Sequence, residues 1–206
     1  FLPASAFAQN LIFNGSLNLG PSQGHLPAWW RLKGSNFTLE TFTTGGQKGS
    51  YCRISGKEGF IVCPAYPLET WREWVKEDHE QYGDKFLFSI WARGRGTLRV
   101  SFEAYALDED RKTVSVESPG PFTVKVSSDE WVRYRHVVRP GAGVMPKWHL
   151  HPGVGAPEGT VDFDEVSLWP ATPVEALMVA EQERLYGTGA LIENLRYAAA
   201  DAAFQA

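Results

Sequence analysis

The sequence has no long apolar run, no basic cluster and only two cysteines, and each of these shortages argues against a class of protein. It carries 20 Lys and Arg against 24 Asp and Glu, a net charge of -4, and no basic run exceeds two residues. A nucleic-acid partner is therefore not expected. No stretch approaches the roughly 20 apolar residues of a membrane-spanning helix. Gly-x-Ser-x-Gly, phosphate-binding glycine loops and His-Glu-x-x-His are also missing, so the sequence offers no specific catalytic motif.

The two cysteines lie in a segment that reads as a hairpin. A turn at residues 56–59 would place Cys52 opposite Cys63 and Ile54 opposite Ile61, because both pairs are symmetric about that turn. A cross-strand disulfide between Cys52 and Cys63 would then stabilise the fold by roughly 2–4 kcal/mol. The alternative is two free thiols buried in the core. An exported protein favours the disulfide.

Export is what the first residues indicate. Residues 1–9 resemble the end of a secretory signal peptide, with Ala6-Phe7-Ala8 as a small-x-small cleavage site before Gln9. This predicts a periplasmic or extracellular protein. If these residues stay on the chain, they predict a retained N-terminal anchor and association with a membrane. The alternative is an alanine-rich end that arose by chance.

Short β-type segments separated by Gly, Pro and Asn turns fill most of the chain. Lys85–Arg93 and Gly96–Leu107 are the clearest, and the second alternates Leu98, Val100 and Phe102 with polar residues. About nine such strands are recognisable, with one helix-like segment at residues 68–82 and no βαβ alternation. We therefore predict an all-β protein in which residues 10–170 form a two-sheet antiparallel jelly-roll β-sandwich.

The strand Gly159–Trp169 ends the β-rich part, and residues 171–206 predict a C-terminal tail of two helices. Thr172 is placed as an N-cap, Pro173 as the first helical residue and Glu175 as the capping-box partner. A second helix is expected after residue 188. The two apolar faces must pack on the sandwich or on a partner protein, since short isolated helices are marginal. These faces consist of Val174, Leu177, Met178 and Leu185, and of Leu191, Ile192, Leu195, Ala199 and Ala202.

Five segments, taken in order, resemble the landmarks of jelly-roll carbohydrate-binding modules of the family 4, 9 and 22 type, which share the galactose-binding-like fold. The resemblance implies a non-catalytic module that binds polysaccharide and often holds a structural calcium ion between its first and last strands. Function follows from it only weakly, because unrelated sites are built on this fold. The segments are Asn10–Ser16, Pro27–Trp30, Phe88–Gly94, Glu130–Tyr134 and Val161–Leu168.

The resemblance makes Asp164 the best-matched calcium ligand, with Glu165 and Asp162 as second choices. Family members usually carry an acidic residue just after the Asn-Gly pair, whereas this chain has Ser16-Leu17 there. That departure weakens the expectation of calcium. The alternative is that Asp164 accepts hydrogen bonds from backbone amides of a neighbouring loop.

Eight tryptophans are many for 206 residues, and flat aromatic faces commonly stack on sugar rings. Most are expected to be structural: Trp91 and Trp131 in strands, Trp29 or Trp30 as a cap, and Trp169 at the end of the last strand. The residues expected to face a carbohydrate are Trp71, Trp74, Tyr105 and Trp148.

His149 and His151 lie on one side of a short predicted strand, a spacing that can hold a divalent metal with a carboxylate such as Glu158. The alternative is two exposed loop histidines. Two functions remain open at this point. One is a non-enzymatic carbohydrate-binding module of the cell envelope. The other is an accessory or scaffolding subunit that docks into a larger envelope or membrane-associated complex through the N-terminal segment and residues 171–206.

Overall fold

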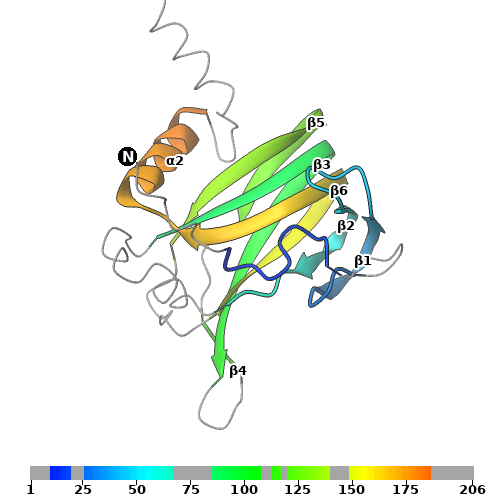
Figure 1. Ribbon diagram of the computed structural model, residues 1–206, viewed down its shortest axis with the longest axis horizontal. Coiled ribbons are helices and arrows are strands. Elements are labelled where there is room, and N and C mark those ends of the chain that lie inside the picture. Colours follow the sequence, from blue (N-terminus) through cyan, green and yellow to red (C-terminus); the bar gives the residue numbers. More distant parts are fainter. Residues whose placement is uncertain are drawn as a thin grey trace, which may run out of the picture.

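The computed structural model describes residues 10–19, 26–66, 85–107, 113–116, 120–139 and 149–186. The signal-like segment, the helix-like segment at 68–82 and the second predicted tail helix lie outside these residues. Figure 1 shows the elements, which are β1 (Arg31–Phe42), β2 (Tyr51–Val62), β3 (Phe86–Leu107), β4 (Thr113–Val116), β5 (Phe122–Val138), β6 (His149–Pro170) and α2 (Pro173–Tyr186).

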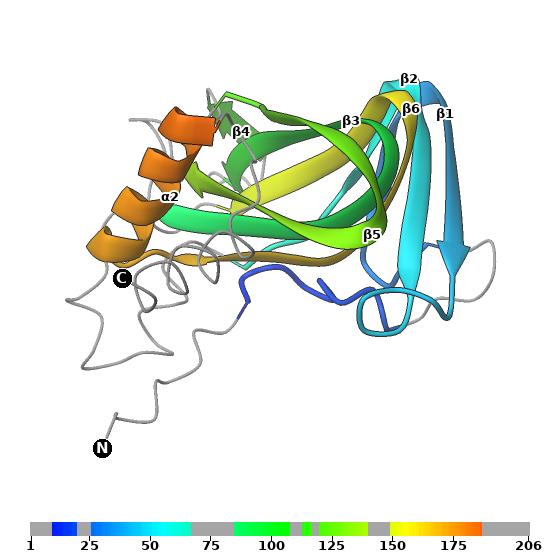
Figure 2. The same cartoon turned by 90° about the horizontal axis from the view of Figure 1, so that it is seen from above.

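All pairings between these strands are antiparallel. The strand order is β1-β2-β6-β3-β4. Strand β5 also pairs with β3: β5 pairs with the first part of β3, and β4 pairs with the last residues of β3. The long strands β3, β5 and β6 curve strongly along their length, as Figure 2 shows. A curved ladder of this kind can close a core without a second, separate sheet.

The two halves of the curved sheet pack face to face, which confirms the predicted jelly-roll β-sandwich. β3 and β6 each span 22 residues and bend at glycines, with φ of 120° at Gly94 and 72° at Gly159. A Cβ at these positions would lie 2.1–2.5 Å from a backbone oxygen, so only glycine permits the bend. Phe88 before the bend consequently packs edge-to-face on Phe102 after it, with ring centroids 5.4 Å apart.

The core lies between these halves and is closed at one edge by the N-terminal segment. Trp30 is buried there, and its Nε1 donates to the carbonyl of Phe13 at 3.1 Å. Alternation along each strand sends every second side chain inward. The largest fully buried side chains are Phe88, Phe102, Phe122, Phe163, Leu11, Leu17, Ile54, Ile61, Ile90, Leu98, Leu150 and Leu168.

The predicted cysteine hairpin is wrong. Residues 51–62 form the single strand β2, whose hairpin partner is β1 through a turn at residues 43–50. Cys52 therefore lies opposite Thr41, and Cys52 and Cys63 are both free and buried. Burial raises the pKa of the Cys52 thiol to about 12, so it is protonated at neutral pH. The expected disulfide is absent, and the alternative of two buried thiols holds.

The two glycines that suggested a turn serve the close packing of β1 on β2 instead. Gly56 pairs with Phe37 at a φ of 126°. Gly59 pairs with Gly34, and a Cβ on Gly59 would overlap the ring of Phe37 at 1.8 Å. The two glycines, three residues apart, therefore mark a bend within one strand and not a turn between two strands.

Helix α2 begins at the predicted capping box. The amide of Glu175 donates to Thr172 Oγ1 at 3.2 Å, and the amide of Thr172 donates to Glu175 Oε2 at 3.0 Å. The helix packs on the sheet through Ala176 and Val179, against Leu87, Val137 and Trp169. In the described part of the chain, no helix is long and apolar enough to cross a membrane.

The apolar face predicted for α2 is not the face that meets the sheet. Val174 is 65% exposed, Leu177 67% and Leu185 53%. The buried contacts come from the smaller side chains, because Ala176 and Val179 allow the helix axis to approach the sheet closely. His136 on β5 and Glu183 on α2 add a polar contact, with Nδ1 and Oε1 2.7 Å apart.

Candidate functional site

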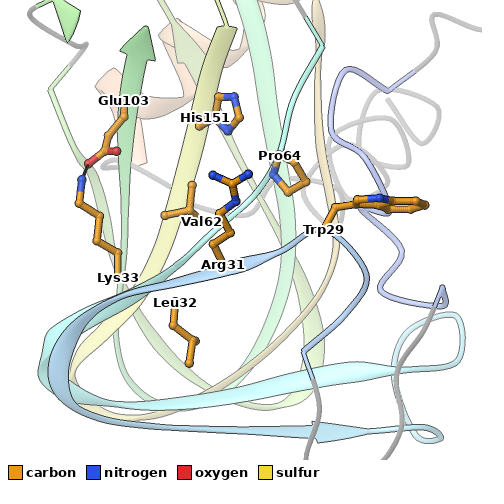
Figure 3. Close-up of a pocket in the computed structure, with 8 residues that line it drawn as sticks. All are labelled: Trp29, Arg31, Leu32, Lys33, Val62, Pro64, Glu103 and His151. Carbon is orange, nitrogen blue, oxygen red and sulfur yellow. Dashed lines mark hydrogen bonds and ion pairs between the residues drawn. The ribbon is translucent and has the colours of Figure 1, made fainter. Parts of the chain in front are cut away.

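Two adjacent pockets lie side by side on the outer face formed by the later part of β2, the first part of β6 and the second part of β3, and Glu103 lines both. The first measures about 370 Å³, and its lining includes Trp29, Arg31, Lys33, Val62, Glu103 and His151 (Figure 3). The second measures about 340 Å³, and its lining includes Lys57, Phe60, Arg99, Ser101, Gly153 and Gly155. We call this pair of pockets the groove; it has the size of a small-ligand site.

The floor of the groove is made by glycines of β6. Because side chains alternate along a strand, Val154 points into the core while Gly153 and Gly155 face outward. A Cβ at Gly153 would lie 2.6 Å from the ring of Phe60, which needs that space. The missing side chains leave a shallow floor with the Phe60 ring at its side.

Trp29 is the exposed aromatic residue at one end of the groove. Its neighbour Trp30 points into the core, so Trp29 points outward, 63% exposed. Its backbone has a φ of 69° in a turn closed by the Trp30 amide and the Pro27 carbonyl, 3.1 Å apart. A left-handed conformation costs a bulky residue roughly 1–2 kcal/mol, and such strain concentrates at functional sites. A flat ring held outward at this cost is suited to stacking on a ligand.

The groove also carries charged and polar groups. Lys33 on β1 forms an ion pair with Glu103 on β3. The Arg31 side chain extends towards Pro64 and His151 (Figure 3). Burial, with smaller effects of His149 and Arg31, lowers the pKa of His151 to about 4, so its imidazole is neutral at pH 7. These groups can donate hydrogen bonds to a polar ligand and accept them from it.

Most of the residues predicted to bind carbohydrate cannot be compared with this groove. Trp71, Trp74 and Trp148 lie outside the described residues. Tyr105 belongs to β3, where its backbone pairs with that of His149, but its side chain is not among those described. These four residues stay predictions.

Sequence analysis does not select Trp29 as a ligand-facing residue. It expects either Trp29 or Trp30 to cap the sandwich, and the structure shows that Trp30 is the buried cap. Two adjacent tryptophans in an extended or turning segment point in different directions, so one buried Trp implies one exposed Trp. That inference was available from the Pro27–Trp30 motif alone.

On the opposite half of the sheet, the carboxylate of Asp162 lies between two arginines and forms an ion pair with each. Arg53 Nε donates to Asp162 Oδ1 at 2.6 Å, and Arg93 Nε donates to Oδ2 at 3.1 Å. The Arg93 guanidinium also lies 4.5 Å from the ring centroid of Trp131 and 5.2 Å from that of Tyr51. Trp131 is thus a partly exposed member of a cation–π stack and not part of the buried core.

The three carboxylates predicted for calcium do not converge. Asp164 is fully buried and accepts hydrogen bonds from the backbone amides of Lys48 at 3.1 Å and Glu165 at 2.7 Å. The Glu165 carboxylate pairs with Lys48 Nζ at 3.3 Å, and Asp162 faces its two arginines. Within the described ranges, no three His, Cys, Asp or Glu side chains cluster as metal ligands.

This arrangement around Asp164 fits the amide-acceptor alternative and does not resemble an oxygen cage for calcium. Burial raises the pKa of Asp164 to about 6, although the amide hydrogen bonds oppose the shift. Calcium binding stays a prediction from the family resemblance. A melting temperature unchanged by a chelator would rule it out.

The histidine pair lies on strand β6, as expected, with ring centroids 5.8 Å apart. The proposed third ligand does not join it, because Glu158 accepts a hydrogen bond from Thr97 Oγ1 at 3.0 Å near the bend of β6. His149 Nδ1 lies 2.8 Å from the carbonyl of Ala65, and His151 is buried. His151 therefore lines the groove, whereas His149 does not, and neither residue lies in an exposed loop.

Comparison with solved structures agrees with the fold described above, a jelly-roll β-sandwich. No protein-family model and no curated protein matches the sequence. Solved structures do match it. The enzymatically active domain of tailspike protein 4 of Bacteriophage CBA120 is 15% identical, with a TM-score of 0.54 over 81% of this chain and 22% of that chain. The present chain thus spans about a fifth of the tailspike chain.

Two further structures match this chain over nearly their whole length. A candidate sugar-binding protein from Bacteroides thetaiotaomicron is 12% identical, with a TM-score of 0.50 over 79% of this chain and 100% of that chain. The xylan-binding domain CBM22-1 from Paenibacillus barcinonensis is 12% identical, with a TM-score of 0.43 over 77% and 92% of the two chains. At these identities the likeness to the tailspike domain and the Bacteroides protein supports the fold alone and leaves the ligand to be argued from the groove.

Proposed function

We propose that this chain is a non-catalytic carbohydrate-binding module whose polysaccharide lies in the groove and stacks on Trp29. The observation that carries the proposal is the exposed ring of Trp29, held in a left-handed backbone conformation beside a pocket of about 370 Å³. Sugar rings present an apolar face for stacking and hydroxyls for hydrogen bonds. The groove supplies the hydrogen-bonding groups in Arg31, Lys33, Glu103 and His151.

Affinity electrophoresis of the full chain through gels containing a panel of polysaccharides tests the proposal. We expect retardation by at least one polysaccharide, and a loss of affinity of about tenfold or more in Trp29→Gly, since burying an aromatic face contributes more than 1.4 kcal/mol. Glycine suits the left-handed position, so the variant should fold. Leu177→Ala is the matched control, because Leu177 is equally exposed but lies on α2. No retardation by any polysaccharide, or unchanged affinity in Trp29→Gly, would overturn the proposal.

Binding without catalysis is part of the same proposal. The two carboxylates of the groove both have partners: Glu103 pairs with Lys33, and Glu58 accepts a hydrogen bond from Asn36 Nδ2 at 3.0 Å. Incubation of the protein with each bound polysaccharide should release no reducing sugar. If reducing sugar is released, and the Glu103→Gln variant no longer releases it, the groove is catalytic and this part of the proposal is wrong. Export to the cell envelope belongs to the proposal through the signal-like residues 1–9.

A second candidate function is docking to a partner protein in an envelope assembly, as an accessory subunit. The exposed apolar side chains Val174, Leu177 and Leu185 on α2 favour it, because they form one helical face. Co-purification of a defined partner that Leu177→Glu abolishes, while Trp29→Gly leaves it intact, would support docking. A chain that stays alone in size-exclusion chromatography and still binds polysaccharide would count against it.

A further inference from the structure

The residues that line the groove have a net positive charge, whereas the whole chain has a net negative charge. Four cations line the two pockets, Arg31, Lys33, Lys57 and Arg99, against the two carboxylates Glu58 and Glu103. The chain as a whole has a net charge of -4. A cationic groove on an acidic protein concentrates anions at that place.

The cations of the groove differ in whether a protein group already neutralises them. Lys33 is paired with Glu103. Arg31, Lys57 and Arg99 form no ion pair with any carboxylate of the described chain, whereas Arg53, Arg93 and Arg95 do. An arginine presents a planar fork of donors that fits carboxylate and sulfate oxygens. Arg31 and Arg99 are thus charged groups free to meet a ligand.

The strand register places these two arginines at opposite sides of the groove. Arg31 on β1 pairs with Val62 on β2, which pairs with Gly153 on β6. Arg99 on β3 pairs with Gly155, two residues further along β6. Three strand spacings of about 4.8 Å separate β1 from β3, so the Cα atoms of Arg31 and Arg99 lie on the order of 15 Å apart, which is the length of a few sugar units. The curvature of the sheet shortens this distance.

We infer that the polysaccharide bound by the groove is anionic, with carboxylate or sulfate groups on its sugar rings, and that Arg31 and Arg99 each bind one such group. This inference rests on the proposed function and narrows its ligand. The glycine floor at Gly153 and Gly155 accepts the sugar rings between the two charged contacts, and His151 lines the groove beyond Arg31. Trp29 at the end of the groove supplies stacking, which neutral and anionic sugars share.

The test compares three kinds of probe with the full chain: polygalacturonate and alginate for carboxylate, dextran sulfate and chondroitin sulfate for sulfate, and xylan and β-glucan as neutral polymers. We expect anionic probes to bind, and Arg31→Gln and Arg99→Gln each to weaken binding about three- to tenfold. Raising NaCl from 0.05 to 0.5 M should weaken it further. The preference between the first two probe groups identifies the anionic group.

Arg95→Gln is the matched control, because Arg95 is exposed, pairs with Asp129 at 3.0 Å and does not line the groove. Equal weakening in Arg95→Gln would mean non-specific charge attraction and would overturn the inference. Binding of neutral polymers alone would also overturn it while the proposed function stands. Failure of every probe would overturn both. Circular dichroism spectra should be unchanged in all three variants, since these arginines are exposed.

Discussion

Lys33 on β1 and Glu103 on β3 form an ion pair although two strands, β2 and β6, lie between theirs in the sheet. In a flat sheet, strands three places apart are separated by about 14 Å, more than these two side chains bridge comfortably. The pair therefore reports how far β1 curls over the outer face of β6 and β3. It also lies over the groove, where Glu103 is the residue that both pockets share.

We predict that this pair contributes little to stability. The side chains of Lys33 and Glu103 are 56% and 39% exposed, so water and salt weaken their attraction. A double-mutant cycle with Lys33→Ala and Glu103→Ala, measured by urea unfolding, should give a coupling free energy of about 0.2–1 kcal/mol. A coupling well above 2 kcal/mol would mean that the pair holds the curl of β1 in place.

Replacing Trp29 with glycine should not destabilise the fold. The φ of 69° is unfavourable for tryptophan and suits glycine, while Trp29 is largely exposed. Trp29→Gly is therefore expected within about 1 kcal/mol of the native protein in unfolding free energy, and Trp29→Ala, which keeps a Cβ, should be no more stable than Trp29→Gly. Thermal melts of both variants check this. A large loss in Trp29→Gly alone would mean that Trp29 is structural, against the role proposed for it.

The bend of β6 should depend on Gly159. Its φ is 72°, and a Cβ there would lie 2.1 Å from the carbonyl oxygen of Arg95. Gly159→Ala is expected to lower the unfolding free energy by about 2 kcal/mol or more. Gly120→Ala is the control, because nothing lies within 4 Å of a Cβ added there. Equal losses of unfolding free energy in Gly159→Ala and Gly120→Ala would contradict the role proposed for Gly159 in the bend of β6.

These glycines also explain which parts of the fold were predictable from the sequence. The alternation around Leu98 and Phe102 depends on local chemistry, so the strands and the all-β class followed from it. The bend depends on contacts between distant strands, such as Gly159 with Arg95. Gly56 and Gly59 imitate a hairpin turn locally, and only the pairing with β1 distinguishes a bent strand from a turn. The disulfide prediction failed for this reason.

The site and the helix were predictable to different extents. The capping box of Thr172 and Glu175 is local, and it formed as expected. The buried face of α2 depends on how closely the sheet approaches, which favours Ala176 over the larger Leu177. The groove depends on Arg31, Glu103 and His151, which meet only through the register of four strands. No spacing in the sequence indicates that meeting.

Helix α2 allows a direct comparison of its two faces. Val179 is 5% exposed and packs on the sheet, so Val179→Asp should cost about 2 kcal/mol or more, because it buries an unpaired charge. Leu177 is 67% exposed, and Leu177→Asp should change the unfolding free energy by no more than about 0.5 kcal/mol. Chemical denaturation of both variants provides the measurement. A large cost at Leu177 would show that another part of the chain, or another molecule, covers that face.

The buried carboxyl of Asp164 should make stability depend on pH in a direction opposite to that of most carboxylates. Burial raises its pKa from 3.8 to about 6 in the folded protein. A raised folded pKa means that the contribution of Asp164 to stability is complete below about pH 4 and is lost as the pH rises through 6. Asp164→Asn cannot ionise, so its unfolding free energy relative to the native protein should rise between pH 4 and pH 7.

The expected rise is up to about 3 kcal/mol, since one pKa unit corresponds to about 1.4 kcal/mol. Urea unfolding of both proteins at pH 4, 5, 6 and 7 measures it, and the contributions of all other titrating groups cancel in the difference. A constant offset from the lost amide contacts of Lys48 and Glu165 does not alter the slope. Asp129→Asn, which removes an exposed carboxylate, controls for the change in net charge. A difference between Asp164→Asn and the native protein that stays constant across this range would mean that the folded pKa of Asp164 is not raised above its unfolded value, because the amide hydrogen bonds offset its burial.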